Sequence, residues 1–376
     1  MRRTRLDPRP DWQARVEKYG LHYHTLRGEP YWDETACYHF TPFEIDTIER
    51  ASYAVHDMCL AAVKHVIDNQ LFGLFLIPRE YEELVVKSWN DEHPSIYGRF
   101  DFAFDGVSPP KLLEYNADTP TALVEAAVAQ WHWLKDVDER GDQFNSIHER
   151  LIEGWKEFAP QMRGPLHFSA MSGVVEDYIT VEYLRDTAIQ AGLDTIYLDV
   201  EQIGWSGPKR MFVDQTNNPI RHIFKLYPWE WLARERFGQH VPRAETVWIE
   251  PAWKMILSCK SLLPLLYELN PESPYLLPAW FEAPEGVDYV RKPIHAREGA
   301  NIQVVRNGAV ILETEGPYRV DREVIYQQYV PLKEYDGRFP VIGSWMINGW
   351  SCGLGIREDD CVITQNTSRF LPHQMS

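Results

Sequence analysis

Charged and amide side chains alternate with apolar ones in two short neighbouring segments. In "RFDFAF" the polar positions are Arg99 and Asp101, and in "KLLEYN" they include Glu114 and Asn116. Alternation with a period of two predicts β-strands, and the intervening "DGVSPP" is typical of a turn. We therefore expect a β-hairpin with an acidic polar face.

Pairing that is symmetric about the turn places Phe104 opposite Lys111 and Asp101 directly across from Glu114. Like charges in such positions destabilise a sheet. A cation between them would remove the repulsion, and the oxygens of Asp101, Glu114 and Asn116 are ligands that Mg²⁺ takes together with water and phosphate. The alternative is a solvated sheet face that carries charges because nothing covers it, and the hairpin alone leaves both interpretations open.

Three basic residues stand in contexts that favour phosphate binding. Lys292 ends a predicted strand before the loop "IHAREGAN", which has Gly299 at its tip, so that a lysine and backbone N–H groups could hold a phosphate together. Lys260 is expected in the middle of a helix, and Arg357 follows the glycine-rich "CGLGI", which allows close backbone approach. Each alone is typical of a surface charge, but with the acidic hairpin they suggest a nucleotide held between two sheets.

Helix signals lie on both sides of the hairpin. Thr41 and Glu44 form a capping box for a long helix, with Pro42 at its first position. After the hairpin, Thr119 is expected to cap a second helix that Pro120 opens. The hairpin would then lead into a helix N-terminus, which is a natural site for an anion.

The remaining elements indicate a mixed α/β protein. Residues 165–226 are predicted to run strand, helix, strand, strand, and residues 250–269 to form one helix that Pro264 disturbs. Strands are expected on both sides of the loop after Lys292, and several more between 323 and 358. No internal repeat or low-complexity linker marks a domain boundary.

Composition excludes several classes of function. A net charge of −17 over 376 residues argues against a protein that binds nucleic acid and against one that binds an anionic membrane surface. The start has no apolar segment after its arginines, and no run approaches the length of a membrane span, so we expect a cytoplasmic protein.

Neither the cysteines nor the standard catalytic motifs indicate another kind of chemistry. The five scattered cysteines include no CxxC pair, which predicts reduced thiols. GxxxxGK[ST], GxGxxG, HExxH and GxSxG are all absent, so the chain is not predicted to be a P-loop enzyme, a dinucleotide-binding protein or one of the familiar hydrolases.

Four long segments carry a family resemblance: "EYNADTPT", "EPAWKMILSCKSLLPLLYEL", "YVRKPIHAREGANI" and "VIGSWMINGWSCGLGIRE". They resemble the synthetase domain of the glutathionylspermidine synthase family, and most of all its short bacterial members, which are provisionally named acid–amine ligases. The resemblance covers nearly the whole chain and implies an ATP-grasp-type fold, circularly permuted because the metal ligands come early, with an additional α/β subdomain. It leaves no room for the amidase domain of the bifunctional members, so no amidase activity is expected.

The resemblance implies a role for each matched residue near the phosphates. Asp101, Glu114 and Asn116 would ligate two Mg²⁺ ions that bridge the phosphates of ATP. Arg99 would contact the γ-phosphate or the acid substrate, and Arg357 would stabilise the transferring phosphoryl group.

Further roles concern the nucleotide and the substrates. Lys260, Lys292 and Gly299 match positions that hold ATP. The adenine would be bound by Gln327, Gln328, Tyr329 and Val330. Thr119 matches a serine of the thiol-peptide site, whereas Glu176 and Lys225 match substrate positions by local alignment only.

The family further implies one catalytic unit, 1–376, with approximate subdomains 1–98, 99–135, 165–235 and 245–376 and a lid near 288–305. The expected function is an ATP-dependent acid–amine ligase that forms an amide through an acyl phosphate, joining a glutathione-like carboxylate to a polyamine-like amine. The partners are then small molecules, and the oligomeric state stays open. A non-catalytic ATP-binding module of the same fold is the alternative.

Overall fold

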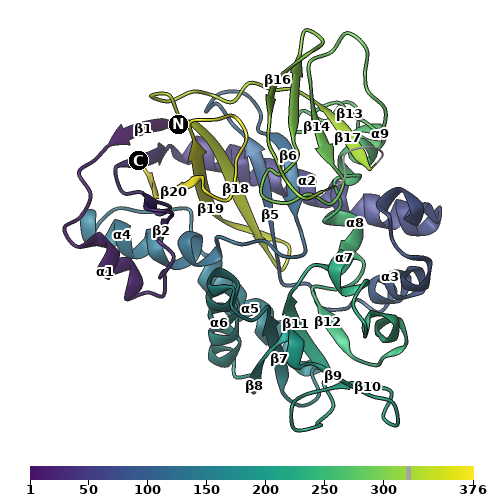
Figure 1. The fold of residues 1–376 in the computed structure, drawn as a ribbon. Helices are drawn as coiled ribbons and strands as arrows, with labels where there is room; N and C mark the ends of the chain where they lie inside the picture. The colour runs from purple at the N-terminus through teal and green to yellow at the C-terminus, as the bar shows by residue number, and fades with distance from the viewer. Residues whose placement is uncertain (319–322) are drawn as a thin grey trace.

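Five antiparallel strands form the central sheet of the computed structural model, which describes residues 1–318 and 323–376 (Figure 1). Their order is β20 (Arg369–Leu371), β19 (Trp350–Asp359), β18 (Phe339–Ile347), β5 (Tyr97–Ala103) and β6 (Lys111–Asn116). The predicted hairpin is therefore β5 and β6, and the C-terminal strand β18 pairs with β5 on the other side. Phe100 and Phe102 point to one buried face of this sheet, as the alternation predicted.

A β-bulge changes the register in the middle of the hairpin. Asp101 pairs with Glu114 and Arg99 with Asn116, as predicted, but Phe102 pairs with Leu112 and Ala103 with Lys111. The expected pairing of Phe104 with Lys111 is therefore wrong, because Leu113 is an extra residue on β6.

A second antiparallel sheet stands beside the central one at the top of the molecule (Figure 1). Its strands, in order, are β13 (Ala279–Trp280), β17 (Val324–Gln328), β14 (Tyr289–Pro293), β15 (Gln303–Arg306) and β16 (Ala309–Glu313). The strands expected around the loop after Lys292 are β14 and β15, so this prediction is confirmed.

A four-stranded parallel sheet forms an α/β unit at the opposite end of the molecule (Figure 1). Its order is β12 (Val247–Ile249), β11 (His222–Leu226), β7 (Leu166–Ala170) and β8 (Thr195–Asp199). The helix α6 (Val175–Gln190) connects β7 to β8, which confirms the predicted strand–helix–strand order and the mixed α/β class. The remaining strands form three small sheets. One consists of β1 (Arg2–Arg5), β4 (Ala36–Phe40) and β21 (His373–Met375). The other two are the pairs β9 (Gly204–Ser206) with β10 (Met211–Val213) and β2 (Thr25–Leu26) with β3 (Glu29–Pro30).

The longest helix, α2 (Pro42–Asp68), has the predicted capping box: the Thr41 hydroxyl accepts from the Glu44 amide, and the Glu44 carboxylate accepts from Thr41. Its buried stripe packs against β18 and β19 and shares one core with Phe100 and Phe102 of β5. The other α-helices are α1 (Trp12–Glu17), α3 (Glu82–Asn90), α4 (Gln130–Val137), α5 (Ile147–Phe158), α7 (Trp229–Leu232), α8 (Lys254–Leu257) and α9 (Leu262–Leu269). Short 3₁₀-helices are η1 (Leu71–Phe75), η2 (Arg79–Tyr81), η4 (Ala159–Gln161), η5 (Val200–Gln202) and η6 (Gly238–Arg243), and η3 (Glu125–Ala129) is a short π-helix. Among the described residues, no helix combines the length and the apolar character needed to cross a membrane.

Two helix predictions are wrong, each for a local reason. The helix after the hairpin begins at Leu123, so Thr119 does not cap it; Ala122 has a left-handed φ of 64°, which keeps the loop non-helical up to that point. Residues 250–269 form two helices, α8 and α9, with Lys260 in the break between them. A proline clashes with the carbonyl group four residues earlier, so Pro264 prevents a continuous helix through Lys260 and lies in the first turn of α9.

Candidate active site

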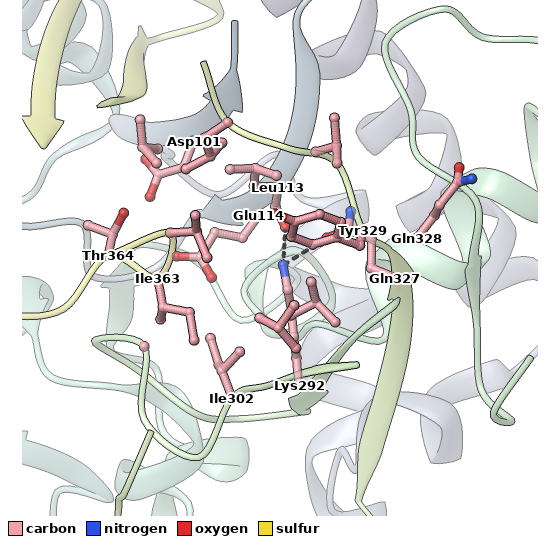
Figure 2. Close-up of a pocket in the computed structure, with 17 residues that line it drawn as sticks. Asp101, Leu113, Glu114, Lys292, Ile302, Gln327, Gln328, Tyr329, Ile363 and Thr364 are labelled. Carbon is pink, nitrogen blue, oxygen red and sulfur yellow. Dashed lines mark hydrogen bonds between the residues drawn. The ribbon is translucent and has the colours of Figure 1, made fainter. Parts of the chain in front are cut away.

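A cavity lies between the central sheet and the second sheet, and both contribute its walls (Figure 2). Apolar side chains line much of it: Leu113, Val290, Ile302, Val304, Leu332, Val341, Val362 and Ile363. Asp101 and Glu114 from the central sheet and Lys292 from the second sheet supply its charged groups. The cavity can therefore hold a molecule with a flat apolar part and a polyanionic part.

Lys292 connects the two sheets across the cavity. Its Nζ donates to the carbonyl of Leu113 at 2.9 Å and to Gln327 Oε1 at 2.7 Å (Figure 2). Gln327 Nε2 in turn donates to the Leu112 carbonyl at 2.9 Å. The bulge at Leu113 thus provides an acceptor for the lysine. Burial lowers the pKa of Lys292 to about 8, although the nearby charge of Glu114 acts in the opposite direction.

The segment from Gln327 to Val330 leaves β17 and lines the same cavity. Figure 2 shows the side chain of Gln328 directed away from the centre of the cavity. The amides of Gln328 and Tyr329 donate to the carbonyls of Pro278 and Asp288, at 2.8 and 2.9 Å. Both amides are therefore engaged within the protein, and these bonds hold the linker in place along the wall of the cavity.

Positive charges and an amide already surround the two facing carboxylates. Arg99 donates from Nε and Nη2 to the two oxygens of Asp101, at 2.7 and 3.0 Å. Asn116 Nδ2 donates to both Asp101 and Glu114, at 3.1 and 3.2 Å, and Lys260 Nζ lies 3.3 Å from Glu114 Oε2. The hypothesis that a bound cation is needed to relieve the repulsion is therefore wrong for the metal-free protein, which uses its own cations.

Glu114 is ionised in this environment. Burial alone would raise its pKa, but the charges of Lys260 and Lys292 and the Asn116 hydrogen bond outweigh burial and lower the pKa to about 2. The oxygens needed for a metal are consequently present in their charged form across the physiological range.

The donor set fits Mg²⁺ only in combination with phosphate. Two carboxylates and the amide oxygen of Asn116 offer oxygens on adjacent strands, and Mg²⁺ commonly takes one or two carboxylates plus phosphate and water. Within residues 1–318 and 323–376, no cluster of three or more His, Cys, Asp or Glu side chains is arranged to hold a metal. Asn116 would have to rotate its amide, since its nitrogen now faces the carboxylates.

A smaller cavity on the same face of the central sheet joins Arg99 to Arg357. Its floor is Gly343 and Gly355, which pair with each other between β18 and β19. A Cβ atom on Gly343 would lie 2.9 Å from Arg99 Cδ, so only glycine leaves room for that side chain. Both predicted catalytic arginines thus reach one cavity beside Asp101.

The loop of residues 294–301 is held at two points, near Ala296 and at Gly299. Lys260 Nζ donates to the Ala296 carbonyl at 2.5 Å. Gly299 has a φ of 68°, and a Cβ there would overlap the Thr364 carbonyl oxygen. Gly299 therefore allows two loops to meet over the cavity, the second of which follows β19.

Arg297 is a site residue that the sequence interpretation missed. Its guanidinium donates to Thr119 Oγ1 and to Glu230 Oε1, both at 2.7 Å. Arg297 lines the cavity that Lys260 and Asn116 also line, and Thr119 is bonded to it from the loop after β6. The sequence signal for Arg297 is a basic residue in a loop of small residues between two strands. The interpretation of this loop used Gly299 alone.

Lys225 lies behind the site and lines none of the three cavities described above. Its Nζ donates to Asp118 Oδ1 at 2.7 Å and to the Tyr227 carbonyl at 2.9 Å, and both side chains of the ion pair are at most 1% exposed. Asp118 also accepts from the Trp229 amide at 2.9 Å. The structure therefore connects Lys225 to the loop that carries Thr119, through Asp118.

Glu176 lies on the arginine side of the site, in the first turn of α6. Burial raises its pKa, and the charge of Arg357 opposes this effect. Burial and the neighbouring Glu176 raise the pKa of Asp177 to about 7. Carboxyl groups of this kind can accept hydrogen bonds from an amine.

Comparisons with known proteins agree on one family. The profile of the family described as glutathionylspermidine synthase preATP-grasp matches residues 3–376. A Haemophilus influenzae protein that carries the provisional name acid–amine ligase is 41% identical, over 98% of this chain and 98% of its own length. Trypanothione synthetase of Crithidia fasciculata is 30% identical over 84% of this chain, and the bifunctional glutathionylspermidine synthetase/amidase of Escherichia coli is 26% identical over 86%.

Two of these relatives are longer than this chain, and a solved structure shares its fold. The chain spans 53% and 56% of the C. fasciculata and E. coli proteins, which are therefore much longer. Among solved structures, a glutathione synthetase-like effector from Globodera pallida matches with a TM-score of 0.59, covering 97% of this chain and 96% of that one at 9% identity. That likeness concerns the fold alone.

We expect Lys225→Met to lower the free energy of unfolding by about 3–5 kcal/mol, because it leaves the buried Asp118 without its counter-charge. Urea denaturation measures this change. Lys64→Met is the control, since Lys64 pairs with Asp68 at the exposed surface and should have little effect. Unchanged stability of Lys225→Met with lost substrate affinity would instead assign Lys225 to substrate binding.

We also expect Asp101→Asn to lower the stability of the metal-free protein by about 1–3 kcal/mol, because the buried Arg99 loses its charged acceptor. Glu114→Gln should act in the same direction and less strongly, since its side chain is 30% exposed. Thermal melting in EDTA measures both variants. Melting temperatures above that of the wild type would mean that repulsion between the carboxylates dominates after all.

Proposed function

This chain belongs to the glutathionylspermidine synthase family and is an ATP-dependent C–N ligase, and from this premise we propose how its site works. ATP binds between the central and second sheets, and the chain joins a carboxylic acid to an amine through an acyl phosphate. We propose a circularly permuted ATP-grasp arrangement, in which β5 and β6 bring metal ligands from early in the chain to the later strands.

One observation carries this proposal, namely the order of groups along the cavities. Apolar walls and the linker at Tyr329 and Val330 suit adenine, and Lys292 and Lys260 follow where phosphates would lie. Asp101 and Glu114 come next, and the arginine cavity lies beyond Asp101. A nucleoside triphosphate has the same sequence of apolar, anionic and reacting parts.

Asp101, Glu114 and Asn116 are the residues that would hold magnesium, which supplies neutralising charge for the phosphate oxygens. Two ions are proposed, in line with the family. Arg99 would contribute a second role here, because binding of a cation at Asp101 competes with its ion pair and frees the guanidinium for the phosphate or the acid.

The reaction needs activation of the acid, because a carboxylate and a protonated amine do not condense at neutral pH. A carboxylate oxygen attacks the γ-phosphorus, the bond to ADP breaks, and an acyl phosphate forms. The neutral amine then attacks the acyl carbon, phosphate leaves, and the amine gives up a proton. Arg99 and Arg357 would stabilise charge on the phosphoryl oxygens, and the loop at Gly299 would exclude water.

The substrates are proposed from the polar groups around the reacting end. Arg297 and Thr119 offer hydrogen-bond donors to a glutathione-like peptide acid. Glu176 and Asp177 offer acceptors to a polyamine-like amine. Lys225 is proposed to act through Asp118 and the loop at Thr119, and not by direct contact.

A non-catalytic ATP-binding module of the same fold is the second candidate. A binding module needs the apolar walls and the lysines, but it does not need two arginines and a glycine floor beyond the phosphates. Conversion of ATP in the presence of both substrates distinguishes the two candidates.

We expect that ADP is released only when Mg²⁺, an acid and an amine are all present. The product should be an amide whose mass is the sum of the masses of the acid and the amine minus one water. Mass spectrometry of a screen of acid–amine pairs, with a coupled assay for ADP, measures both. EDTA should abolish both ADP release and the stabilisation that ATP gives in thermal melting. Tight ATP binding in EDTA, or ATP binding with Mg²⁺ but no amide from any pair, would favour the alternative.

Arg357→Lys should lower kcat by about 10²-fold or more and leave the KM for ATP within about threefold. Lysine keeps the charge but lacks the planar fork that stabilises a transferring phosphoryl group. Steady-state kinetics with varied ATP measures the two constants. Arg150→Lys, on the exposed surface of α5, is the matched control; a kcat equal to that control would remove Arg357 from the mechanism.

A further inference from the structure

The segment that follows β19 turns back over Arg357. Within it, Ser368 Oγ donates to Asp359 Oδ2 at 2.5 Å and accepts the Gln365 amide at 2.8 Å. The Ser368 amide in turn donates to the Gln365 carbonyl at 3.1 Å. The Ser368 side chain thus holds the amide of Gln365, and the Ser368 main chain holds its carbonyl.

The Gln365 carbonyl is also the acceptor for Arg357. Nη2 of Arg357 donates to it in a short hydrogen bond. Over the described ranges of the chain, this is the one hydrogen bond that the guanidinium makes, and its Nε is buried without a partner. The orientation of Arg357 in its cavity thus depends on where the Gln365 carbonyl lies.

Ser368 itself is not placed to contact a substrate. It is 1% exposed, its hydroxyl hydrogen is directed to Asp359, and a lone pair of its oxygen is used by Gln365. A neighbouring residue of the same segment, Thr364, lines both the larger cavity and the arginine cavity. The segment therefore meets the site through Thr364 and Gln365, and Ser368 holds it from behind.

We propose that Ser368, anchored by Asp359, is a positioning residue for Arg357: its hydroxyl holds the Gln365 amide and so fixes the turn whose Gln365 carbonyl aims the guanidinium into the cavity shared with Arg99. The inference rests on the proposed function, which places Arg357 at the transferring phosphoryl group. A donor stabilises developing charge only if it is oriented before the reaction. Loss of the serine should consequently affect turnover and leave nucleotide binding intact.

The first test is kinetic. Ser368→Ala should lower kcat by about tenfold or more, with the KM for ATP within about threefold of wild type. In an Arg357→Lys background the same change should have little further effect, because residues that act through one another are not additive. A drop in kcat of equal size in both backgrounds would overturn the proposal.

Matched variants separate positioning from general loss of packing. Ser88 is also fully buried, donates to the Val85 carbonyl at 2.9 Å and accepts the Trp253 amide at 3.0 Å, away from the cavities. Ser88→Ala should leave kcat near wild type, and an equal loss there would overturn the proposal. Asp359→Asn keeps an acceptor for Ser368 and should show a smaller loss than Ser368→Ala; it also provides the test if Ser368→Ala does not fold.

The second test does not need turnover. The side-chain Nε–H signal of Arg357, assigned by its loss in Arg357→Lys, reports rotation of the guanidinium by NMR. Ser368→Ala should speed this rotation, and Ser88→Ala should not. An unchanged rotation overturns the positioning role even if the ligase is active, whereas faster rotation in a protein without ligase activity supports it and refutes only the proposed function.

Discussion

Two carboxylates held opposite each other inside the protein are the constraint around which this structure is arranged. Asp101 and Glu114 pair across β5 and β6, and three cations come to them from separate parts of the chain: Arg99 from β5, Lys260 from the α8–α9 break, and Lys292 from β14. Charges that are partly withdrawn from water, as these are, are stabilised by such compensation. The three cations exceed the two carboxylates, so the site has positive charge to spare for phosphates. Neutralisation of the carboxylates therefore requires the two antiparallel sheets to face each other.

A second set of buried charges fixes the α/β unit against the central sheet. Glu250, just after β12, accepts from the amides of Ile96 and Tyr97 at 2.9 and 3.1 Å, and Lys254 Nζ lies 2.6 Å from its other oxygen. Lys254 also donates to the Tyr97 carbonyl at 2.6 Å. Together with the Lys225–Asp118 pair, these bonds set where β5 begins and where the loop after β6 lies. Rigid placement of the strand that carries Arg99 and Asp101 follows from them.

The sequence predicted what depends on local periodicity. Alternation placed Asp101 across from Glu114 correctly, and the capping residues of α2 were read from Thr41 and Glu44. The bulge at Leu113 interrupts the alternation with two adjacent leucines, Leu112 and Leu113. Such a pair also fits a regular strand that is buried on both faces, so it does not by itself predict a bulge. Lys260 was misplaced because the effect of Pro264 on the carbonyl four residues earlier was read as a disturbance and not as a break. Arg297 and the Ser368 segment belong to loops, whose contacts depend on the whole fold and have no period to read.

The pairing of β18 with β5 has a consequence for how the chain acquires its structure. Gly343 lies beside Asp101 in the finished sheet, yet the ribosome makes it far later than Asp101. Until that strand emerges, one edge of β5 has no partner. Contacts between such distant segments slow folding, since a long loop must close before they form. An open strand edge is therefore exposed on the nascent chain during most of its synthesis. A chaperone that covers such edges would act at this stage.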